Sequence, residues 1–209
     1  MMKARITALL VFSFFCGIAQ FNPQSKKITE KFFPEKDIEI NTPAFAKTKG
    51  FTTYQELMAF LDKQVAEHPQ QISYTFIGKS QKGREIPMLK IEGPKSASKK
   101  VKVWIQAGLH GNEPASTEGV LYLIDRLLND AQYAQVLTNI DLAIIPMANI
   151  DGYQKQDRYA ANGLDLNRDQ TKLNAPESVV LKQAFSDFGA DVALDFHEYR
   201  PFRRDYAQL

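Results

Sequence analysis

The sequence contains a single cysteine, Cys16, among its 209 residues. Cys16 lies within the apolar N-terminal segment, so a chain that has lost that segment contains no thiol at all. Disulfide scaffolds and catalysis by a cysteine nucleophile are therefore excluded for the rest of the chain. Phe15 precedes the cysteine where a lipid-modified bacterial lipoprotein needs a small residue, which argues against that class as well.

The chain also lacks an excess of charge of either sign, since 26 basic and 24 acidic residues leave a net charge of +2. The one dense basic cluster, residues 95–102, is typical of a solvated loop between strands, so no nucleic-acid partner is expected. Internal repeats and long low-complexity runs are absent too. With 44% hydrophobic residues, the composition predicts one globular domain with its own core.

Long hydrophobic runs are scarce, and the one that stands out is Ile6–Phe15, which follows two basic residues. Small residues come next, so residues 1–19 are predicted to be a signal peptide that is cleaved before Gln20. An uncleaved membrane anchor is the alternative, but the run is shorter than the about 20 residues that a spanning helix needs. We therefore expect an exported protein, periplasmic or secreted, with no membrane contact after cleavage.

Residues 51–209 show alternating helical and strand patterns, whereas residues 20–50 are polar, contain three prolines and are predicted to form a linker or N-terminal arm. After residue 100 the two patterns alternate, which indicates an α/β fold with a mixed, largely parallel sheet. The predicted helices are 51–67, 114–128 and 176–188, and the predicted strands are 72–77, 85–91, 101–105, 140–147 and 192–197.

Histidine is rare, with three in the chain. His68 ends a predicted helix and is expected at the surface, whereas His110 and His197 each follow an apolar strand. His110 stands three residues before Glu113 in GLHGNE, between a strand and a helix, where α/β sheets bind their ligands. An imidazole and a carboxylate at this spacing can bind one metal ion, and a distant third ligand would complete a catalytic zinc site.

A long, polar, irregular stretch covers residues 149–169, with the sequence NIDGYQKQDRYAANGLDLNRD. Segments of this kind inside a compact domain are usually functional. It contains Arg158, Asp165, Asn167 and Arg168. An arginine beside an asparagine can bind a carboxylate through charge-assisted hydrogen bonds, and a surface loop with solvated arginines is the alternative.

Three blocks in this order, GLHGNE, NIDGY…R…GLDLNR and DFHEY, resemble the zinc carboxypeptidases of the M14 family over residues 51–209. The resemblance implies a three-layer fold with the sheet between helices. It also implies that one Zn²⁺ ion is held by His110, Glu113 and His197. The implied activity is hydrolysis of the C-terminal peptide bond of peptides or proteins by metal-activated water.

The same resemblance implies roles for the polar stretch. Asp165 would hold the imidazole of His110 and fix its tautomer. Asn167 and Arg168 would bind the terminal carboxylate of the substrate. Arg158 would be catalytic, because it would polarise the scissile carbonyl and stabilise the oxyanion.

One departure from the family pattern concerns Asn112, which stands where the animal digestive enzymes have arginine. HGNE also resembles the aspartoacylase and succinylglutamate desuccinylase deacylases. A zinc amidase of that type, or a cell-wall peptide hydrolase, is therefore an alternative, although the DLNR block with its upstream arginine favours the peptidase.

The second departure concerns the parts that follow the last ligand in the family: the general base, the capping tyrosine and the floor of the specificity pocket. The chain ends at Leu209, so we expect residues 51–209 to be the N-terminal part of a longer catalytic domain, with an exposed apolar sheet edge and no activity alone. Glu198 neighbours a ligand, but strand alternation should point it away from the metal. A zinc-retaining binding module without catalysis is the third possibility.

Overall fold

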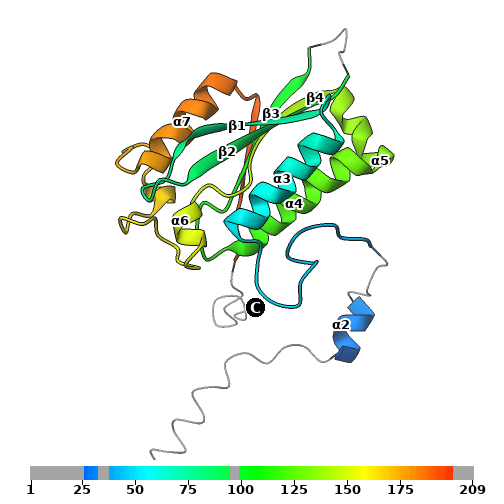
Figure 1. Ribbon diagram of the computed structural model, residues 1–209, viewed down its shortest axis with the longest axis horizontal. Helices are drawn as coiled ribbons and strands as arrows, with labels where there is room; N and C mark the ends of the chain where they lie inside the picture. Colours follow the sequence, from blue (N-terminus) through cyan, green and yellow to red (C-terminus); the bar gives the residue numbers. More distant parts are fainter. Residues whose placement is uncertain (1–25, 33–37, 95–98, 200–209) are drawn as a thin grey trace, which may run out of the picture. The chain divides into compact units, whose positions relative to one another are not determined.

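The computed structural model describes residues 26–32, 38–94 and 99–199 (Figure 1). The predicted signal peptide lies outside these residues. The chain divides into two compact units, 1–39 and 40–209. The first contains α2 (Lys26–Phe32), a helix that our prediction of a linker or arm did not include. Among the described residues, every helix is too short or too polar to cross a bilayer.

The second unit is built on a five-stranded sheet with the strand order β1-β2-β4-β3-β5. β1 (Ile72–Lys79) and β2 (Glu85–Glu92) form an antiparallel hairpin, and β2 is also antiparallel to β4 (Ile140–Ile145). β3 (Val101–Ala107) runs parallel to both β4 and β5 (Val192–Phe196). The α/β class and the mixed sheet are confirmed, and the carboxyl ends of β3 and β5 meet at one edge of the sheet.

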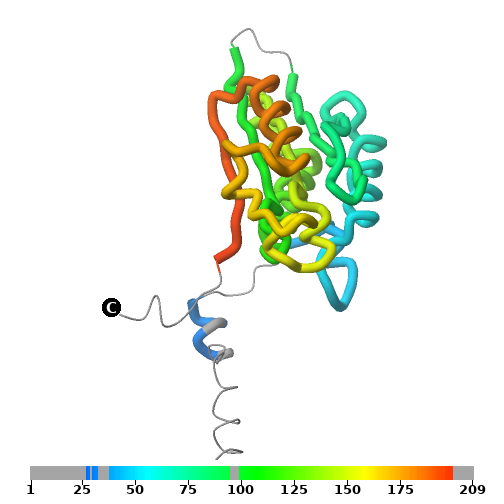
Figure 2. The backbone as a smooth tube through the Cα atoms, turned by 90° about the vertical axis from the view of Figure 1, so that its left-hand side faces the viewer, coloured from blue at the N-terminus to red at the C-terminus, as the bar shows by residue number. Residues whose placement is uncertain are grey.

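Helices cover both faces of this sheet (Figures 1 and 2). α3 (Tyr54–Glu67) and α4 (Pro114–Asn129) lie on one face, and α7 (Pro176–Phe188) lies on the other. Trp104 of β3 contacts Phe185 of α7 edge-on, with the ring centroids 5.5 Å apart. The predicted three-layer arrangement is therefore confirmed. Two short helices connect α4 to β4: α5 (Ala131–Ala134) and η1 (Gln135–Thr138).

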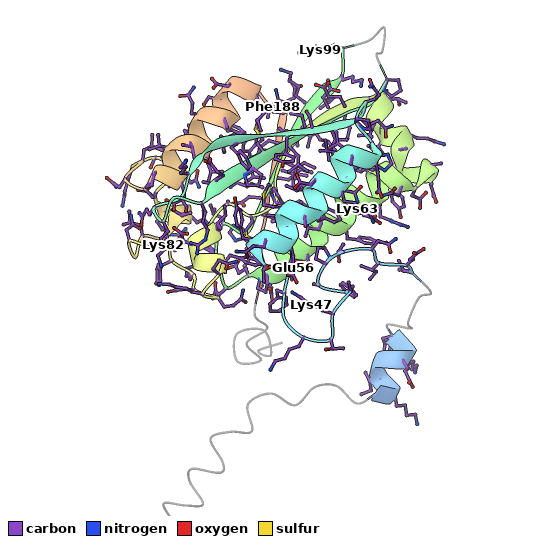
Figure 3. The ribbon with its side chains drawn as sticks, viewed as in Figure 1. Lys47, Glu56, Lys63, Lys82, Lys99 and Phe188 are labelled. Atoms are coloured by element: carbon purple, nitrogen blue, oxygen red, sulfur yellow. The ribbon has the colours of Figure 1, made fainter. Side chains whose placement is uncertain are left out.

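The start of α3 shows how local sequence sets an element boundary. Thr53 and Glu56 form a capping box, in which each side chain accepts the backbone N–H of the other residue. Lys47, labelled beside Glu56 in Figure 3, donates to the Glu56 carboxylate at 2.6 Å and to the Phe51 carbonyl at 2.8 Å. The helix begins at Tyr54 rather than Phe51, because Thr53 takes the N-cap.

β5 is an edge strand, and all five of its residues are exposed. Its apolar side chains Val192, Leu194 and Phe196 remain 44%, 43% and 40% exposed. No strand of the described residues pairs with its outer side. The apolar edge that we predicted is confirmed, and His197 directly follows this least covered strand of the sheet.

Candidate metal centre

The loop after β3 brings His110 and Glu113 to the start of α4. Gly108 opens it at φ +64, a conformation that glycine adopts without strain. Ser116 then closes it, because its hydroxyl accepts the Gly108 N–H at 3.0 Å and donates to the Glu113 carbonyl at 2.7 Å. Pro114 occupies the first turn of α4, where no N–H is needed. The loop is therefore fixed at both ends, and His110 is buried within it.

His110, Glu113 and His197 converge at the carboxyl ends of β3 and β5. Nδ1 of His110 lies 2.8 Å from Oε1 of Glu113, and Nδ1 of His197 lies 2.7 Å from Oε2. One potential ligand atom from each residue falls within 4.8 Å of the others, and no further group of this kind occurs in the described part of the chain. The structure thus brings the three predicted ligands together.

The Glu113 carboxylate remains anionic in this setting. Burial by itself would raise the pKa of Glu113, but the Glu198 N–H, 3.1 Å from Oε2, and the two imidazoles outweigh burial. The pKa of Glu113 is therefore held below its usual range. A metal ligand must be deprotonated, so this carboxylate is ready to bind a cation at neutral pH.

Asp165 connects the histidine loop to Arg158. Its Oδ1 lies 3.1 Å from Nε2 of His110 and accepts the Asn167 N–H at 2.9 Å. Its Oδ2 accepts a hydrogen bond from Nε of Arg158 at 3.0 Å and forms an ion pair with Nη2 at the same distance. Burial alone would raise the pKa of Asp165, but Arg158 and His110 lower it below the usual range.

Arg158 is thereby placed beside the ligand cluster. Its Nη1 lies 3.3 Å from Nδ1 of His110 and 3.7 Å from Oε1 of Glu113. The side chain is still 35% exposed, so a bound molecule could reach the guanidinium. Asn167 and Arg168 follow Asp165 in η2 (Leu166–Arg168), where Arg168 is exposed and donates to the Asn167 carbonyl at 3.2 Å.

The stretch 149–169 is less irregular than predicted, because it contains α6 (Ile150–Tyr153) as well as η2. Asn149, which sequence reasoning did not single out, organises it. The fully buried Asn149 side chain accepts the Gly152 N–H at 3.0 Å and donates to the Arg158 carbonyl at 3.3 Å. Asparagine is among the preferred helix N-cap residues, and its place just after the apolar strand could have identified it.

The histidine loop packs directly against this stretch at Gly111. A Cβ on Gly111 would lie 2.1 Å from the carbonyl carbon of Gly152, 2.3 Å from the Tyr153 nitrogen and 2.4 Å from the Asp157 oxygen. All three are backbone atoms, which cannot rotate away. Only glycine therefore permits the loop carrying His110 to lie this close to α6.

The side chains of Glu198 and His68, two other residues considered in the sequence, make contacts outside the ligand cluster. The Glu198 carboxylate accepts the Ala115 N–H at 3.1 Å, at the start of α4, so it is engaged in helix capping. His68 follows α3 as its C-cap, with Nε2 3.0 Å from Oδ1 of Asn129. His68 lies at the surface, as expected, and is half-buried there.

Asp169 joins the end of the stretch to α7. Its Oδ1 accepts the backbone and side-chain N–H groups of Asn174 at 3.1 and 3.0 Å, and its Oδ2 accepts the Ala175 N–H at 2.8 Å. Burial alone would raise the pKa of Asp169, but these donors outweigh it and hold the pKa below the usual range. Asp169 therefore stabilises the fold as an anion.

Replacing Asp169 with asparagine is expected to lower the free energy of unfolding at pH 7 by about 1–3 kcal/mol, because charge-assisted hydrogen bonds are lost. A depressed pKa contributes stability that is complete above the unfolded value, about 3.9, and is lost as pH falls through the folded pKa. The difference between Asp169→Asn and the wild type should therefore shrink from pH 5 toward pH 2. Thermal unfolding followed by circular dichroism measures this stability difference. A difference that stays constant with pH would contradict a stabilising role for the Asp169 anion.

Fold and cluster together define the class: an α/β protein with a two-histidine, one-carboxylate site at the carboxyl ends of parallel strands, as in metal-dependent hydrolases. A family model described as zinc carboxypeptidase matches residues 57–203, and the chain belongs to this family.

The chain is similar to carboxypeptidase 2 of Trichophyton rubrum, with 32% identity over 177 residues, 77% of this chain and 33% of that protein. Among solved structures it resembles carboxypeptidase A from Helicoverpa armigera, with a TM-score of 0.66 and 25% identity over 75% of this chain and 50% of that one. It also resembles a metallo-carboxypeptidase from Burkholderia cenocepacia, with a TM-score of 0.64 and 26% identity over 70% of this chain and 41% of that one. The chain thus spans about a third of the length of the carboxypeptidase 2 relatives that it matches.

Proposed function

We propose that the protein is a zinc-dependent carboxypeptidase that removes residues from the C-termini of peptides or proteins. The observation that carries this proposal is the convergence of His110, Glu113 and His197 within 4.8 Å, with the Arg158 guanidinium beside them. Family membership supports the same reaction. Two of the predicted ligands follow β3 and the third follows β5, so segments far apart in sequence contribute to one site. Chance alone would rarely bring such residues together.

The donor set fits a single zinc ion. Two imidazole nitrogens and one carboxylate oxygen are a usual protein contribution to a catalytic zinc site. The low pKa of Glu113 keeps its oxygens available, and Asp165 holds the far nitrogen of His110. When bound, zinc supplies a Lewis acid that polarises a carbonyl and lowers the pKa of a coordinated water.

The residues around the cluster would position and stabilise the reacting groups. Asp165 aims the Arg158 guanidinium, which would meet the negative charge that develops on the carbonyl oxygen. Asn167 and Arg168 would bind the terminal carboxylate. The Glu198 carboxylate is engaged at α4, so we do not assign it as the general base.

Cleavage should depend on a free terminal carboxylate. With the complete protein, a blocked dipeptide should be hydrolysed in a zinc-dependent reaction. Its C-terminal amide should show a kcat/KM about 10- to 100-fold lower, because charge-assisted hydrogen bonds to the carboxylate are lost. Arg168→Gln should reduce this preference, whereas Lys172→Gln, at another exposed basic residue, should preserve it. Equal cleavage of both substrates, or faster cleavage of N-acyl amino acids, would overturn the proposal and indicate a deacylase.

A further inference from the structure

We propose that Asp195 is a positioning residue that holds His197 in the orientation and tautomer required for metal binding. This inference rests on the zinc site of the proposed function. Nε2 of His197 lies 3.1 Å from Oδ2 of Asp195, while its Nδ1 lies 2.7 Å from Glu113. The imidazole is thus held between two carboxylates, one at the cluster and one behind it.

The arrangement repeats what Asp165 does for His110. Both histidines direct Nδ1 to the Glu113 carboxylate, and both place Nε2 3.1 Å from an aspartate oxygen. The two ring centroids are 4.8 Å apart. Each ring therefore has a separate anionic partner on the side away from the cluster, although the two aspartates lie on unrelated segments.

The position of Asp195 follows from the geometry of β5. Residues two apart in a strand point to the same face, so Asp195 and His197 project from the same side of the chain. β5 is paired through Asp195 with Gln106 of β3, and its outer side has no partner strand in the described part of the chain. His197 therefore follows a strand that a neighbouring strand holds on one side only.

His110 contrasts with His197 in this respect. The His110 side chain is 3% exposed, so the surrounding loop already restricts its ring, whereas the His197 side chain is 17% exposed. A ring with less packing around it depends more on its hydrogen bonds for orientation. We therefore expect the carboxylate of Asp195 to contribute directly to metal affinity rather than only to the stability of β5.

The contact between Asp195 and His197 determines which tautomer the His197 imidazole adopts. A neutral imidazole carries its proton on one nitrogen, and only the other can bind a metal. An acceptor at Nε2 keeps the proton there and leaves the lone pair of Nδ1 free. An anionic acceptor also raises the basicity of the ligand, and removing such partners usually costs about 10- to 100-fold in metal affinity.

The test measures the zinc affinity of the complete protein by competition with a chromophoric chelator. Asp195→Ala should bind zinc about 10- to 100-fold more weakly than the wild type. Asp195→Asn, which keeps an acceptor without the charge, should lie between them. Asp191→Ala is the matched control, because Asp191 lies just before the same strand and its carboxylate accepts the Lys102 N–H at 2.9 Å. It should leave zinc affinity unchanged.

A second measurement separates orientation from folding. In ¹H–¹⁵N spectra of the zinc-loaded wild type, the His197 imidazole should show a protonated Nε2 with a low-field, hydrogen-bonded proton, and in Asp195→Ala this proton should move upfield. Unchanged zinc affinity in Asp195→Ala would overturn the inference and leave the zinc site intact. Equal weakening by Asp191→Ala would overturn it too, because the effect would then come from general loosening of β5. A complete wild-type protein that binds no zinc would overturn both this inference and the proposed function.

Discussion

Replacing Glu113 with glutamine is expected to reduce zinc affinity by at least about a hundredfold, because loss of a direct ligand should exceed the loss of a ligand's partner. Glutamine keeps the size of the side chain but removes the negative charge that faces both imidazoles. Its amide would also present an N–H to one of the two histidines. Chelator competition measures the change, and the zinc-dependent rise in melting temperature should disappear with it.

The matched control for this substitution is Glu118→Gln, further along α4. Glu118 accepts the backbone N–H and the hydroxyl of Thr52 at 2.7 and 2.8 Å, so its loss should lower stability. It has no contact with the histidines in the described structure, and zinc affinity should remain that of the wild type. If Glu113→Gln binds zinc as tightly as this control, Glu113 does not belong to the ligand set.

Gly111→Ala is expected to lower the free energy of unfolding by at least about 3 kcal/mol, because a methyl group has no space there. The new Cβ would meet backbone atoms of Gly152, Tyr153 and Asp157 at 2.1–2.4 Å. Relief would require the histidine loop and α6 to move apart. Chemical denaturation measures the loss of stability, and zinc titration of the variant should show weaker binding because His110 moves with the loop.

Gly119→Ala provides the comparison for Gly111→Ala. Gly119 lies within α4, and a Cβ there would have no neighbour within 4 Å. Alanine should therefore stabilise the chain by up to about 1 kcal/mol through its higher helix propensity. Two glycine-to-alanine changes in one short region should thus act in opposite directions. A Gly111→Ala variant as stable as the wild type would show that the loop and α6 are not in close contact.

Most of the elements could be predicted from the sequence, because their apolar spacing alone identifies them. The helix predicted at 176–188 coincides with α7, and the strand predicted at 85–91 differs from β2 by one residue. His110, Glu113 and His197 could be predicted because each stands at the end of a strand pattern, where a parallel sheet gathers its ligands. Their distances and partners required the structure.

The remaining features depend on hydrogen bonds between side chains and backbone, which leave no periodic pattern. α6 exists because Asn149 caps its first turn, and η2 begins where the Asp165 side chain accepts the Asn167 N–H. Both lie in a stretch that sequence reasoning described as irregular. Asp195 could not be recognised either, because its relation to His197 depends on how the strand places residues two apart.

The contacts at the end of β5 also affect how firmly the strand is held in the sheet. His197 and Glu198 attach the end of this strand to Glu113, and Glu198 also caps α4 through Ala115. A cation bound there would favour the state in which β5 is docked over the state in which it is detached. Removal of the cation would then loosen the end of β5 before the rest of the sheet opens.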